Sequence, residues 1–597
     1  MKTEHRVASG DVELAVRSSG DPAKPTIVLV HGFPDTSEVW RPVEEFLLGT
    51  NHVAAYDVRG AGASTAPSRL EDYRMERLVE DLSAVVDAVS PDRPVHLAGH
   101  DWGSIQLWEA VCSPLLAGRI ASFTSMSGPS LDHAGAWTRE RLRHPSGRHV
   151  RDVLRQGARS WYMAAFHMPG VQGALRRNVQ RGFRRFIERR EGVSPTESYP
   201  AATLPRDAAN GVNLYRASIA GHLLHPRPRH TDVPVQLIDA VDDPFLTPAL
   251  LEGLERIAPR LWRRPINESH WALRRNPALI AGMISEFVEH IEGGPGSPEL
   301  QRARVVPGRP FAGRIVVVTG AGSGIGRETA LAFASRGAEV VAADINPDGA
   351  ARTATLAGLL GADAHHYQVD VGDTDGMETF AKWVEHDIGV PDVVVNNAGI
   401  GMGGAILDTE VADWERVLHV NLWGVIHGCR LFGRQMVERG AGGHIVNVAS
   451  AAAFSPGRAF PAYATTKAAV LMLTESLRTE LAPSHIGVSA ICPGIIDTGI
   501  VTRTRFVGAG SAEQQQTREE IQRLYRRRRF TPDKVAEAIV RAVELNKAIV
   551  TVAPEAHLAR LVYRASPGLA RKIGSVDVTR RIGSRKRGRP QPNTMDA

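Results

Sequence analysis

Asp101 stands at the centre of the motif Gly-His-Asp-Trp-Gly (residues 99–103), which follows the apolar run 95–98. A strand that ends in Gly-x-nucleophile-x-Gly and turns directly into a helix holds the central residue in a strained conformation, with its side chain exposed above a sheet. A carboxylate there attacks an sp3 carbon and forms an ester, whose carbonyl water can attack afterwards. A serine would leave an ether without such a carbonyl. The motif therefore favours opening of epoxides or carbon–halogen bonds over ester cleavage.

Four residues could complete this chemistry. His270 comes late in the first half, as expected for a base in the chain order nucleophile, acid, base. Asp243 follows a predicted strand and can orient the imidazole, and the adjacent Asp242 remains an alternative. An oxyanion hole needs two backbone N–H groups. Trp102, directly after the nucleophile, and Phe33, in the turn His-Gly-Phe-Pro (residues 31–34), are placed to supply them.

A glycine-rich turn, Thr-Gly-Ala-Gly-Ser-Gly-Ile-Gly (residues 319–326), marks a second site. It follows an apolar run and opens a helical segment, where backbone N–H groups bind a pyrophosphate. Asp344 ends the next predicted strand, so its carboxylate can accept hydrogen bonds from both ribose hydroxyls and would repel a 2′-phosphate. NAD is therefore favoured over NADP, although Arg327, just after the turn, keeps NADP open as an alternative.

Tyr463 and Lys467 lie one helical turn apart and on one helix face. An ammonium beside a phenol and a nicotinamide ribose lowers the pKa of the phenol and makes it a usable acid or base. Ser450, 13 residues before Tyr463, can bind a substrate oxygen, and Asn421 can anchor a water for proton relay. Together these residues can bind a substrate oxygen and exchange a proton with it.

Both sets of residues need a scaffold that brings them to one sheet edge. Apolar runs alternate with helical segments in both halves, which predicts an α/β fold class with parallel sheets covered on both faces. Residues 131–230 carry no strand pattern and predict a helical lid, while Gly-Gly-Pro-Gly-Ser-Pro (residues 293–298) predicts a domain boundary. The predicted strands are 26–30, 52–56, 95–98, 234–238, 315–318, 339–343 and 445–448.

Residues 1–292 resemble the epoxide hydrolases of the α/β-hydrolase fold. In that family two lid tyrosines bind the epoxide oxygen, and the contexts of Tyr162 and Tyr215 are similar to the two tyrosine motifs. The resemblance implies that Asp101 opens an epoxide and that His270 activates water to release a vicinal diol. The elbow and the His-Gly-x-Pro turn are shared with haloalkane dehalogenases, so a dehalogenase remains the alternative, although Phe33 replaces the Asn often found there. Trp161, Phe166 and Met168 predict either an apolar tunnel or lid core.

Residues 312–565 resemble the short-chain dehydrogenase/reductase family, which has a Rossmann-like, doubly wound parallel sheet. The family motifs occur in the expected order. The reaction that the resemblance implies is hydride exchange between a nicotinamide and a secondary alcohol or ketone. The resemblance implies Tyr463 as acid/base, association into homo-oligomers, and a cofactor site made by Gly320, Ser323, Gly324, Ile325, Gly326, Asp344, Asp370, Val371, Asn397, Ala398, Tyr463, Lys467, Pro493, Gly494 and Thr498.

The whole chain resembles actinobacterial fusions of an epoxide hydrolase with a short-chain dehydrogenase, which implies apolar substrates and a place in lipid metabolism. A diol released by the first site is a secondary alcohol that the second could oxidise. Unrelated substrates, or one half kept as a binding or dimerisation module, remain alternatives. We expect no metal at either site. A linker is predicted over residues 293–311 and a basic tail over 566–597.

Charge and cysteine usage limit the partners and the compartment. Of 597 residues, 43% are hydrophobic and 23% charged, with a net charge of +6. Eight Lys or Arg and one acid between residues 571 and 589 account for the whole excess of positive charge, so nucleic-acid binding is not expected. The basic tail is expected to be solvated, and weak contact with acidic lipid headgroups is the alternative. Three scattered cysteines, and no signal or membrane-spanning run, predict a cytoplasmic protein, peripheral at a membrane if the tail binds lipid.

Overall fold

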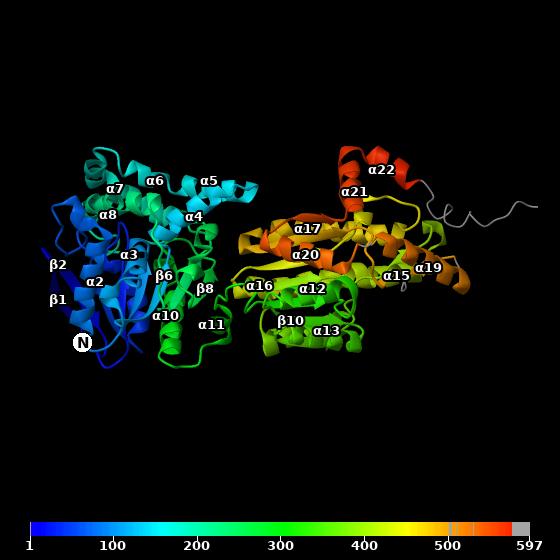
Figure 1. Cartoon of the computed structure of the whole chain (residues 1–597), viewed down its shortest axis with the longest axis horizontal. Helices are drawn as coiled ribbons and strands as arrows, with labels where there is room; N and C mark the ends of the chain where they lie inside the picture. The colour runs from blue at the N-terminus through cyan, green and yellow to red at the C-terminus, as the bar shows by residue number, and fades with distance from the viewer. Residues whose placement is uncertain (1, 501–503, 509, 529, 576–597) are drawn as a thin grey trace, which may run out of the picture. The chain divides into compact units, whose positions relative to one another are not determined.

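The computed structural model describes residues 2–500, 504–508, 510–528 and 530–575. The chain forms two compact units, Met1–Pro307 and Gly308–Ala597. In Figure 1 the first unit runs in colour from blue to green, and the second from green to red. Each unit is built around its own sheet.

The sheet of the first unit has the strand order β1-β2-β4-β3-β5-β6-β7-β8. β3 through β8 run parallel, and their near-continuous apolar sequences suit strands buried on both faces. The polar first residues form an antiparallel hairpin that the sequence analysis did not predict, in which Val7, Leu14 and Val16 alternate into the core. The strands are β1 Lys2–Ser9, β2 Val12–Ser19, β3 Thr26–Val30, β4 His52–Tyr56, β5 Val95–His100, β6 Ile120–Met126, β7 Val235–Ala240 and β8 Leu261–Ile266.

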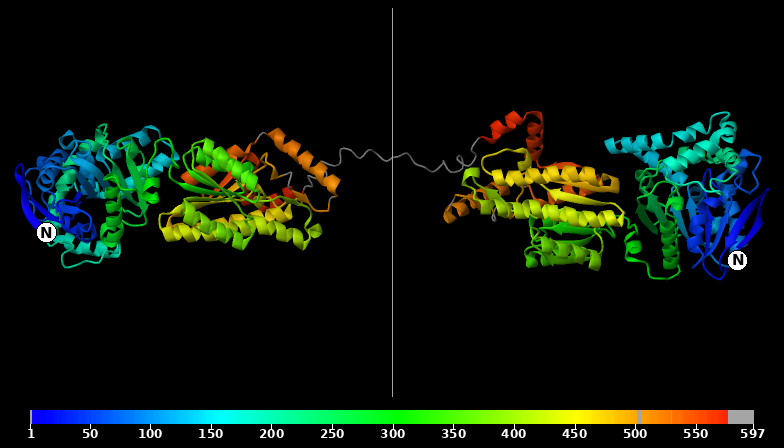
Figure 2. Two further views of the ribbon diagram at one scale, coloured as in Figure 1. Left: turned by 90° about the horizontal axis from the view of Figure 1, so that it is seen from below. Right: turned by 180° about the vertical axis from the view of Figure 1, so that it is seen from behind.

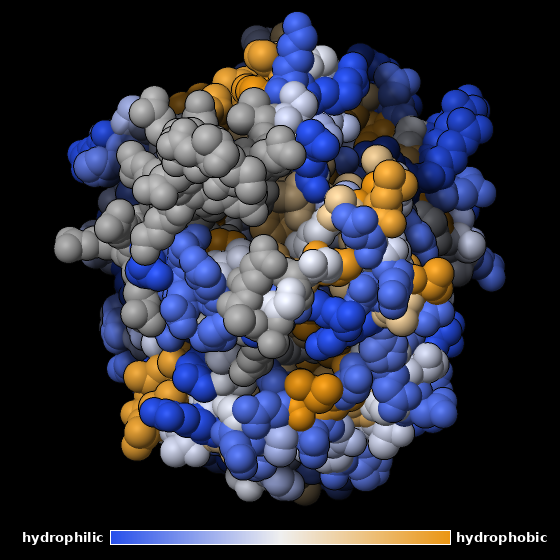
Figure 3. Space-filling view, turned by 90° about the vertical axis from the view of Figure 1, so that its right-hand side faces the viewer, coloured by the Kyte–Doolittle hydropathy of each residue, from blue (hydrophilic) through white to orange (hydrophobic). Residues whose placement is uncertain are grey.

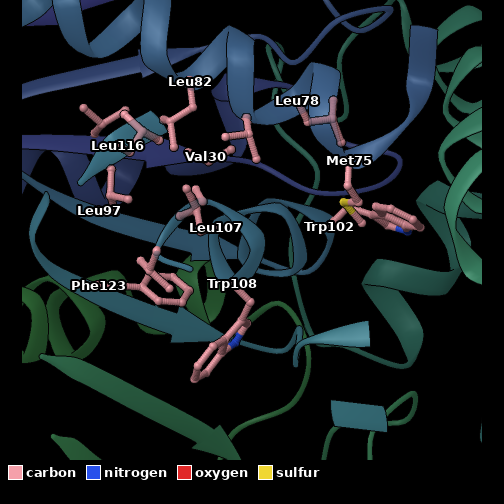
Figure 4. Close-up of a cluster of buried hydrophobic side chains, with 14 of the residues drawn as sticks. Val30, Met75, Leu78, Leu82, Leu97, Trp102, Leu107, Trp108, Leu116 and Phe123 are labelled. Atoms are coloured by element: carbon pink, nitrogen blue, oxygen red, sulfur yellow. The ribbon is translucent and has the colours of Figure 1, made fainter. Parts of the chain in front are cut away.

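The core beneath the elbow fixes the position of Asp101. The helices α2 (Met75–Val89) and α3 (Trp102–Ala110) pack against the sheet. Figure 4 shows Leu107 and Trp108 of α3 reaching toward Leu97 of β5 and Phe123 of β6. These buried side chains hold the start of α3 against the end of β5, so the turn between them has little freedom to relax.

The predicted lid consists mainly of helices and contains no strand among its described residues. It consists of α4 (Leu131–Arg143), α5 (Gly147–Arg159), α6 (Trp161–Ala165), α7 (Val171–Arg189) and α8 (Leu204–Leu224), drawn in cyan to green in Figure 1. α7 and α8 pack along each other, and α4 packs against α8. The lid is inserted between the neighbouring parallel strands β6 and β7, so it starts from the carboxyl end of β6, beside the strand β5 that carries the elbow.

The sheet of the second unit is parallel and doubly wound, with the order β11-β10-β9-β12-β14-β15-β17. Helices cover both of its faces in Figure 2. The order reverses between β9 and β12, and such a switch point opens a ligand crevice at the carboxyl ends of the strands. The strands are β9 Ile315–Thr319, β10 Glu339–Asp344, β11 Ala364–Gln368, β12 Val393–Asn396, β14 Gly443–Val448, β15 Ile486–Pro493 and β17 Ile549–Val552.

The helices of the second unit begin with α12 (Gly324–Ala334) and continue with α13 (Pro347–Leu359), α14 (Thr374–Trp383), α15 (Val411–Leu418), α16 (Gly424–Arg439), α17 (Pro461–Leu481), α19 (Ser511–Arg528), α20 (Pro532–Glu544), α21 (Pro554–Ala565) and α22 (Pro567–Gly574). A short ribbon pairs β13 (Met402–Gly403) with β16 (Arg505–Phe506). No helix among the described residues combines the length and the apolar character that a bilayer crossing requires.

Two segments differ from the predicted boundaries. Part of the linker expected over 293–311 is folded, because α11 (Pro298–Arg302) buries Leu300 against Trp262 and Phe287 of the first unit. The tail expected from residue 566 begins as α22, whose Gly574 lies against the backbone of Pro456. Residues 576–597, which carry most of the predicted tail, lie outside the described residues.

Candidate active sites

Asp101 has the strained backbone that the elbow motif predicts, with φ 52° and ψ −121°. Close packing leaves no room for a side chain at the first or the last glycine of the motif. A Cβ at Gly103 would lie 2.1 Å from the carbonyl oxygen of Val30, and one at Gly99 would lie 2.7 Å from the backbone nitrogen of Ser104. The two glycines are therefore required for the turn that presents the Asp101 carboxylate.

His270 lies between the two carboxylates that the sequence analysis assigned to it. Its Nδ1 donates to Oδ2 of Asp243 at 2.8 Å, and its Nε2 lies 3.7 Å from Oδ2 of Asp101. The backbone N–H groups of Phe245 and Leu246 donate to the other oxygen of Asp243. The alternative acid, Asp242, is exposed, so the arrangement favours Asp243 as the partner of His270.

Burial and charge set the protonation of this group. Burial raises the pKa of Asp101 to about 6, although His270 and two backbone N–H donors act in the opposite direction. Burial lowers the pKa of His270, but the charges of Asp243 and Asp101 outweigh it and raise that pKa to about 9. Burial also raises the pKa of Asp243, and His270 more than offsets this, so the pKa ends below its usual value. Near neutral pH the group therefore holds an imidazolium between two carboxylates.

The two backbone N–H groups that the sequence analysis selected both contact the carboxylate of Asp101. The backbone N–H of Phe33 donates to Oδ1 at 2.7 Å, and the N–H of Trp102 also hydrogen-bonds to the carboxylate. These donors leave Oδ2, on the His270 side, as the oxygen available for attack. Both N–H groups are therefore in place to stabilise the oxyanion that forms when water attacks an ester of Asp101.

The lid brings both predicted tyrosines to the nucleophile. Tyr162 of α6 and Tyr215 of α8 hydrogen-bond to each other. Burial is the largest cause that raises the pKa of each phenol, and the charge of Asp101 raises both further. The Tyr215 ring centroid lies 4.8 Å from that of Trp102 and 5.3 Å from that of Phe33. Both phenols therefore keep their protons near neutral pH and can serve as donors.

The three residues expected in an apolar tunnel or in the lid core have different surroundings in the structure. Phe166 packs edge-on against Tyr215, with ring centroids 4.8 Å apart, and so belongs to the wall of the site. Trp161 and Met168 are instead 69% and 62% exposed. Neither of these two is lid core.

Three residues near His270 were missed by the sequence analysis. Asp35, 5% exposed, accepts a hydrogen bond at 2.8 Å from Trp271 Nε1, and burial raises its pKa to about 6. Glu191, 1% exposed, accepts one from the Trp271 backbone at 3.2 Å and helps to raise the pKa of His270. His100 Nε2 donates to the His270 carbonyl at 2.9 Å. His100 lies inside the elbow motif and Asp35 directly follows the His-Gly-Phe-Pro turn, so both could have been found, whereas Glu191 follows the end of α7 without any local signal.

One further cluster in the first unit contains Glu109, Asp132 and His222, residue types that also bind metals. Arg229 donates to both Glu109 and Asp132 at 2.6 Å, and His222 bonds to Asp132 at 3.1 Å. An ion-pair network thus occupies this position, where it connects α3, α4 and the segment after α8.

In the second unit the glycine-rich turn leads into α12, and close contacts explain its glycines. A Cβ at Gly326 would lie 2.2 Å from the Gly320 carbonyl oxygen, and one at Gly322 would lie 2.8 Å from the Asp344 carboxyl carbon. The Gly322 N–H donates to Asp344 Oδ2 at 2.8 Å. Arg327 donates to the carbonyl of Gly322 and, at 3.2 Å, to Thr353, so its guanidinium is held in the turn.

Lys467 is buried beside Tyr463 on α17. Its Nζ donates to the Val448 carbonyl at 2.8 Å and lies 5.9 Å from the centroid of the Tyr463 ring. Burial lowers the pKa of Lys467 to about 8. Ser450 caps a short helix by accepting from the backbone N–H of Ala452 at 3.1 Å.

Asn421 lies in a π-helical segment, His419–Trp423, a feature that is frequent at functional sites. Its amide bonds to the backbone of Ile400 in both directions and to Thr466. It is fully buried and is not among the residues that line the cavity beside Tyr463.

A cavity of about 980 Å³ joins these residues to the cofactor positions. Ser450, Tyr463 and Lys467 line it, together with every predicted cofactor residue except Gly326. A void of this size is at the upper end of ligand sites and can hold a dinucleotide with a substrate. The close turn at Gly320 and Gly326, which any Cβ would fill, fits the approach of a pyrophosphate.

Without bound cofactor, Lys467→Met should raise the free energy of unfolding of the second unit by about 2 kcal/mol at pH 7. Each unit by which burial lowers the pKa of Lys467 corresponds to about 1.36 kcal/mol, and the one hydrogen bond that the change removes offsets part of this gain. The pKa of Lys467 is lower in the folded than in the unfolded protein, so the unfolded chain binds more protons from about pH 8 to 10.5. The unchanged protein therefore gains stability as pH rises through that window, and the advantage of Lys467→Met should shrink. Calorimetry of the second unit's transition checks this. The exposed Lys382→Met is the control, and a loss of stability in Lys467→Met would contradict the prediction.

Comparisons with known proteins identify both units. The short chain dehydrogenase family matches residues 314–506, and the alpha/beta hydrolase fold family matches residues 25–277. "3beta-hydroxysteroid dehydrogenase 2" of Eggerthella lenta is 37% identical over 192 residues, which are 32% of this chain and 74% of that protein. A crystal structure of a short chain dehydrogenase/reductase from Burkholderia phymatum in complex with NAD is 29% identical, covers 45% of this chain and 96% of that one, and has a TM-score of 0.41.

"Probable oxidoreductase EphD" of Mycobacterium tuberculosis matches the chain through both units. It is 42% identical over 588 residues, which cover 95% of this chain and 97% of that protein. The predicted union of an α/β hydrolase with a short-chain dehydrogenase is thereby confirmed. The chain belongs to the EphD-like family of fusion enzymes, in which an α/β-hydrolase-fold domain precedes a short-chain dehydrogenase domain.

Proposed function

We propose that the first unit hydrolyses an apolar epoxide to a vicinal diol through an ester of Asp101. The observation that carries this proposal is the pairing of a carboxylate nucleophile with two lid phenols. An alkoxide leaves poorly without a proton donor, and Tyr162 and Tyr215 supply one beside Asp101. A halide needs no such donor.

In the first step Oδ2 of Asp101 attacks an epoxide carbon and the carbon–oxygen bond breaks. One of the two phenols, Tyr162 or Tyr215, gives its proton to the departing oxygen and becomes a phenolate, while the other donates a hydrogen bond. The reaction removes the negative charge of Asp101, which is one of the charges that raise the pKa of His270. The imidazolium then loses its proton more readily, and this proton restores the phenol that protonated the alkoxide. The ester itself therefore converts His270 into the base that the second step needs.

In the second step neutral His270 takes a proton from water, whose oxygen attacks the ester carbonyl carbon. Phe33 and Trp102 hold the oxyanion through their backbone N–H groups. Collapse of the tetrahedral intermediate breaks the bond between the carbonyl carbon and Oδ2, and His270 gives its proton to the departing diol oxygen. Asp101 is left with one oxygen from water, and its carboxyl proton passes to His270, which restores the starting carboxylate and imidazolium. Asp243 stabilises the imidazolium and fixes its orientation throughout.

The rate of epoxide opening should fall below about pH 6, since the attacking Asp101 must be ionised and its pKa is about 6. The expected decline in kcat/KM is about tenfold for each pH unit below this value, because kcat/KM reports the free enzyme. Diol formation measured from pH 8 to 4.5, with the acid-catalysed background subtracted, checks this. A constant kcat/KM down to pH 4.5 would contradict the assignment.

We also propose that the second unit oxidises a secondary alcohol or reduces a ketone with NAD. A bound nicotinamide supplies hydride exchange at its C4 atom. The chain's own residues then act on the proton: Tyr463 exchanges it with the substrate oxygen, Ser450 positions that oxygen, and Lys467 stabilises the Tyr463 phenolate. The carboxylate of Asp344 lines the cavity and favours a free ribose hydroxyl over a phosphate.

Asp344→Asn should weaken NAD binding about tenfold while NADP binding improves, because the repulsion of the 2′-phosphate disappears. Titration of cofactor fluorescence with NADH and NADPH measures both affinities. Asp348→Asn, an exposed acid on α13, is the matched control and should leave both unchanged. Equal losses for the two cofactors would contradict the NAD assignment.

The two reactions combine into one sequence if the diol is a substrate of the second unit. One carbinol carbon then loses a hydride to NAD and its hydroxyl group loses a proton to Tyr463, which leaves a hydroxyketone. The test supplies purified protein with an apolar epoxide and NAD and follows NADH. Diol without NADH, even when diol is supplied directly, would contradict sequential action, and halide release from a haloalkane without epoxide turnover would contradict the hydrolase proposal.

A further inference from the structure

We propose that α21 and α22 form a docking surface for a membrane that carries anionic lipids. The two helices follow the last strand of the second sheet and lie beyond α17 in Figure 1. They pack against each other, and α21 also packs on the short helix Ala451–Phe454. The large apolar side chains of both helices point away from the protein.

Large apolar side chains of these helices face solvent, whereas small ones face the protein. Leu558 and Leu561 on α21 are 61% and 66% exposed, and Leu569 and Ile573 on α22 are 48% and 57% exposed. The buried positions are instead occupied by Ala556 and Ala570. An ordinary surface helix buries its largest apolar residues. Figure 3, which views this end of the second unit, shows exposed hydrophobic side chains among hydrophilic ones.

Positive charge surrounds these apolar side chains. Residues 554–575 contain Arg560, Arg564, Arg571 and Lys572 against one acid, Glu555. Residues 576–597 add six Lys or Arg and two Asp to the sequence. Exposed leucines flanked by cations are the pattern of a helix that lies in a lipid interface, with the cations attracted to acidic headgroups.

The charge argues against a second copy of this chain as the occupant. In a symmetric dimer the same patch meets itself, so four cations on one copy would face four on the other. An anionic bilayer instead supplies both the apolar layer and the opposite charge. α21 also lines the dehydrogenase cavity through Glu555 and Ala559, so a docked membrane would lie next to the wall of that cavity. Membrane binding of this kind requires neither of the reactions proposed above.

Flotation of the full-length protein with lipid vesicles tests the proposal. We expect binding to vesicles of phosphatidylcholine with about one third phosphatidylglycerol, loss of binding at high salt, and little binding to pure phosphatidylcholine. Arg571→Gln with Lys572→Gln should lower the partition coefficient about tenfold or more, since each cation near an anionic surface contributes about fivefold. Leu558→Gln with Leu561→Gln should lower it by a similar factor.

Leu407→Gln is the matched control, because Leu407 is 95% exposed on the same unit but lies outside these helices. It should float as the unchanged protein does, and activity on a water-soluble alcohol shows that all variants are folded. The proposal is overturned if the double leucine variant floats normally, which would assign binding to residues beyond 575. It is also overturned if light scattering shows that the leucine changes alter the oligomeric state while flotation stays unchanged.

Discussion

Asp101→Asn is expected to abolish conversion of an epoxide to a diol, with a loss of about 10⁴-fold or more in kcat. Asn retains an oxygen that can accept from Phe33, so the oxyanion hole and the elbow stay intact. It has no charged oxygen to attack carbon, and therefore no ester forms. Gas chromatography of the diol measures the loss, and oxidation of a simple secondary alcohol by the second unit should remain unchanged.

Asp242→Asn is the matched control for this prediction. It removes an exposed carboxylate next to Asp243 and should leave the hydrolysis rate within about twofold, whereas Asp243→Asn should lower it strongly because His270 loses its partner. A single turnover in water enriched in heavy oxygen gives the decisive measurement. The label should enter Asp101, and a diol labelled directly by the solvent with Asp101 unlabelled would refute the ester mechanism.

Tyr463→Phe is expected to lower alcohol oxidation by about 10³-fold, while NADH still binds with its normal affinity. The phenol is the only group in the proposal that exchanges a proton with the substrate oxygen, and Phe keeps the ring against Lys467 without the hydroxyl. NADH formation measures the rate, and fluorescence titration measures cofactor affinity. Epoxide hydrolysis by the first unit should be unaffected.

Tyr563→Phe provides the matched control, because Tyr563 is a partly exposed tyrosine on α21 in the same unit. It should oxidise the alcohol at the normal rate. If Tyr463→Phe keeps more than about one tenth of the activity, another group must exchange the proton, and the role given to Tyr463 is incorrect.

The sequence by itself determined the elements that carry local chemistry. Apolar runs such as 26–30 and 315–318 became β3 and β9, because strands buried on both faces need continuous apolar residues. The spacing of Tyr463 and Lys467 placed both on α17, since four residues are close to one helical turn. Glycines in the elbow and the cofactor turn were identifiable because the tight turns admit no side chain.

Only the tertiary structure decided which distant groups meet. The sequence favoured Asp243 but left the adjacent Asp242 open, and the loop after β7 brings Asp243 into a hydrogen bond with His270. The carboxylate of Glu191 reaches the same region through the packing of a lid helix, for which no local motif exists. The polar first residues form an antiparallel hairpin that extends the sheet, because β2 pairs with β4, the outermost of the parallel strands. Each of these outcomes depends on contacts between segments far apart in the chain, and local spacing carries no information about such contacts.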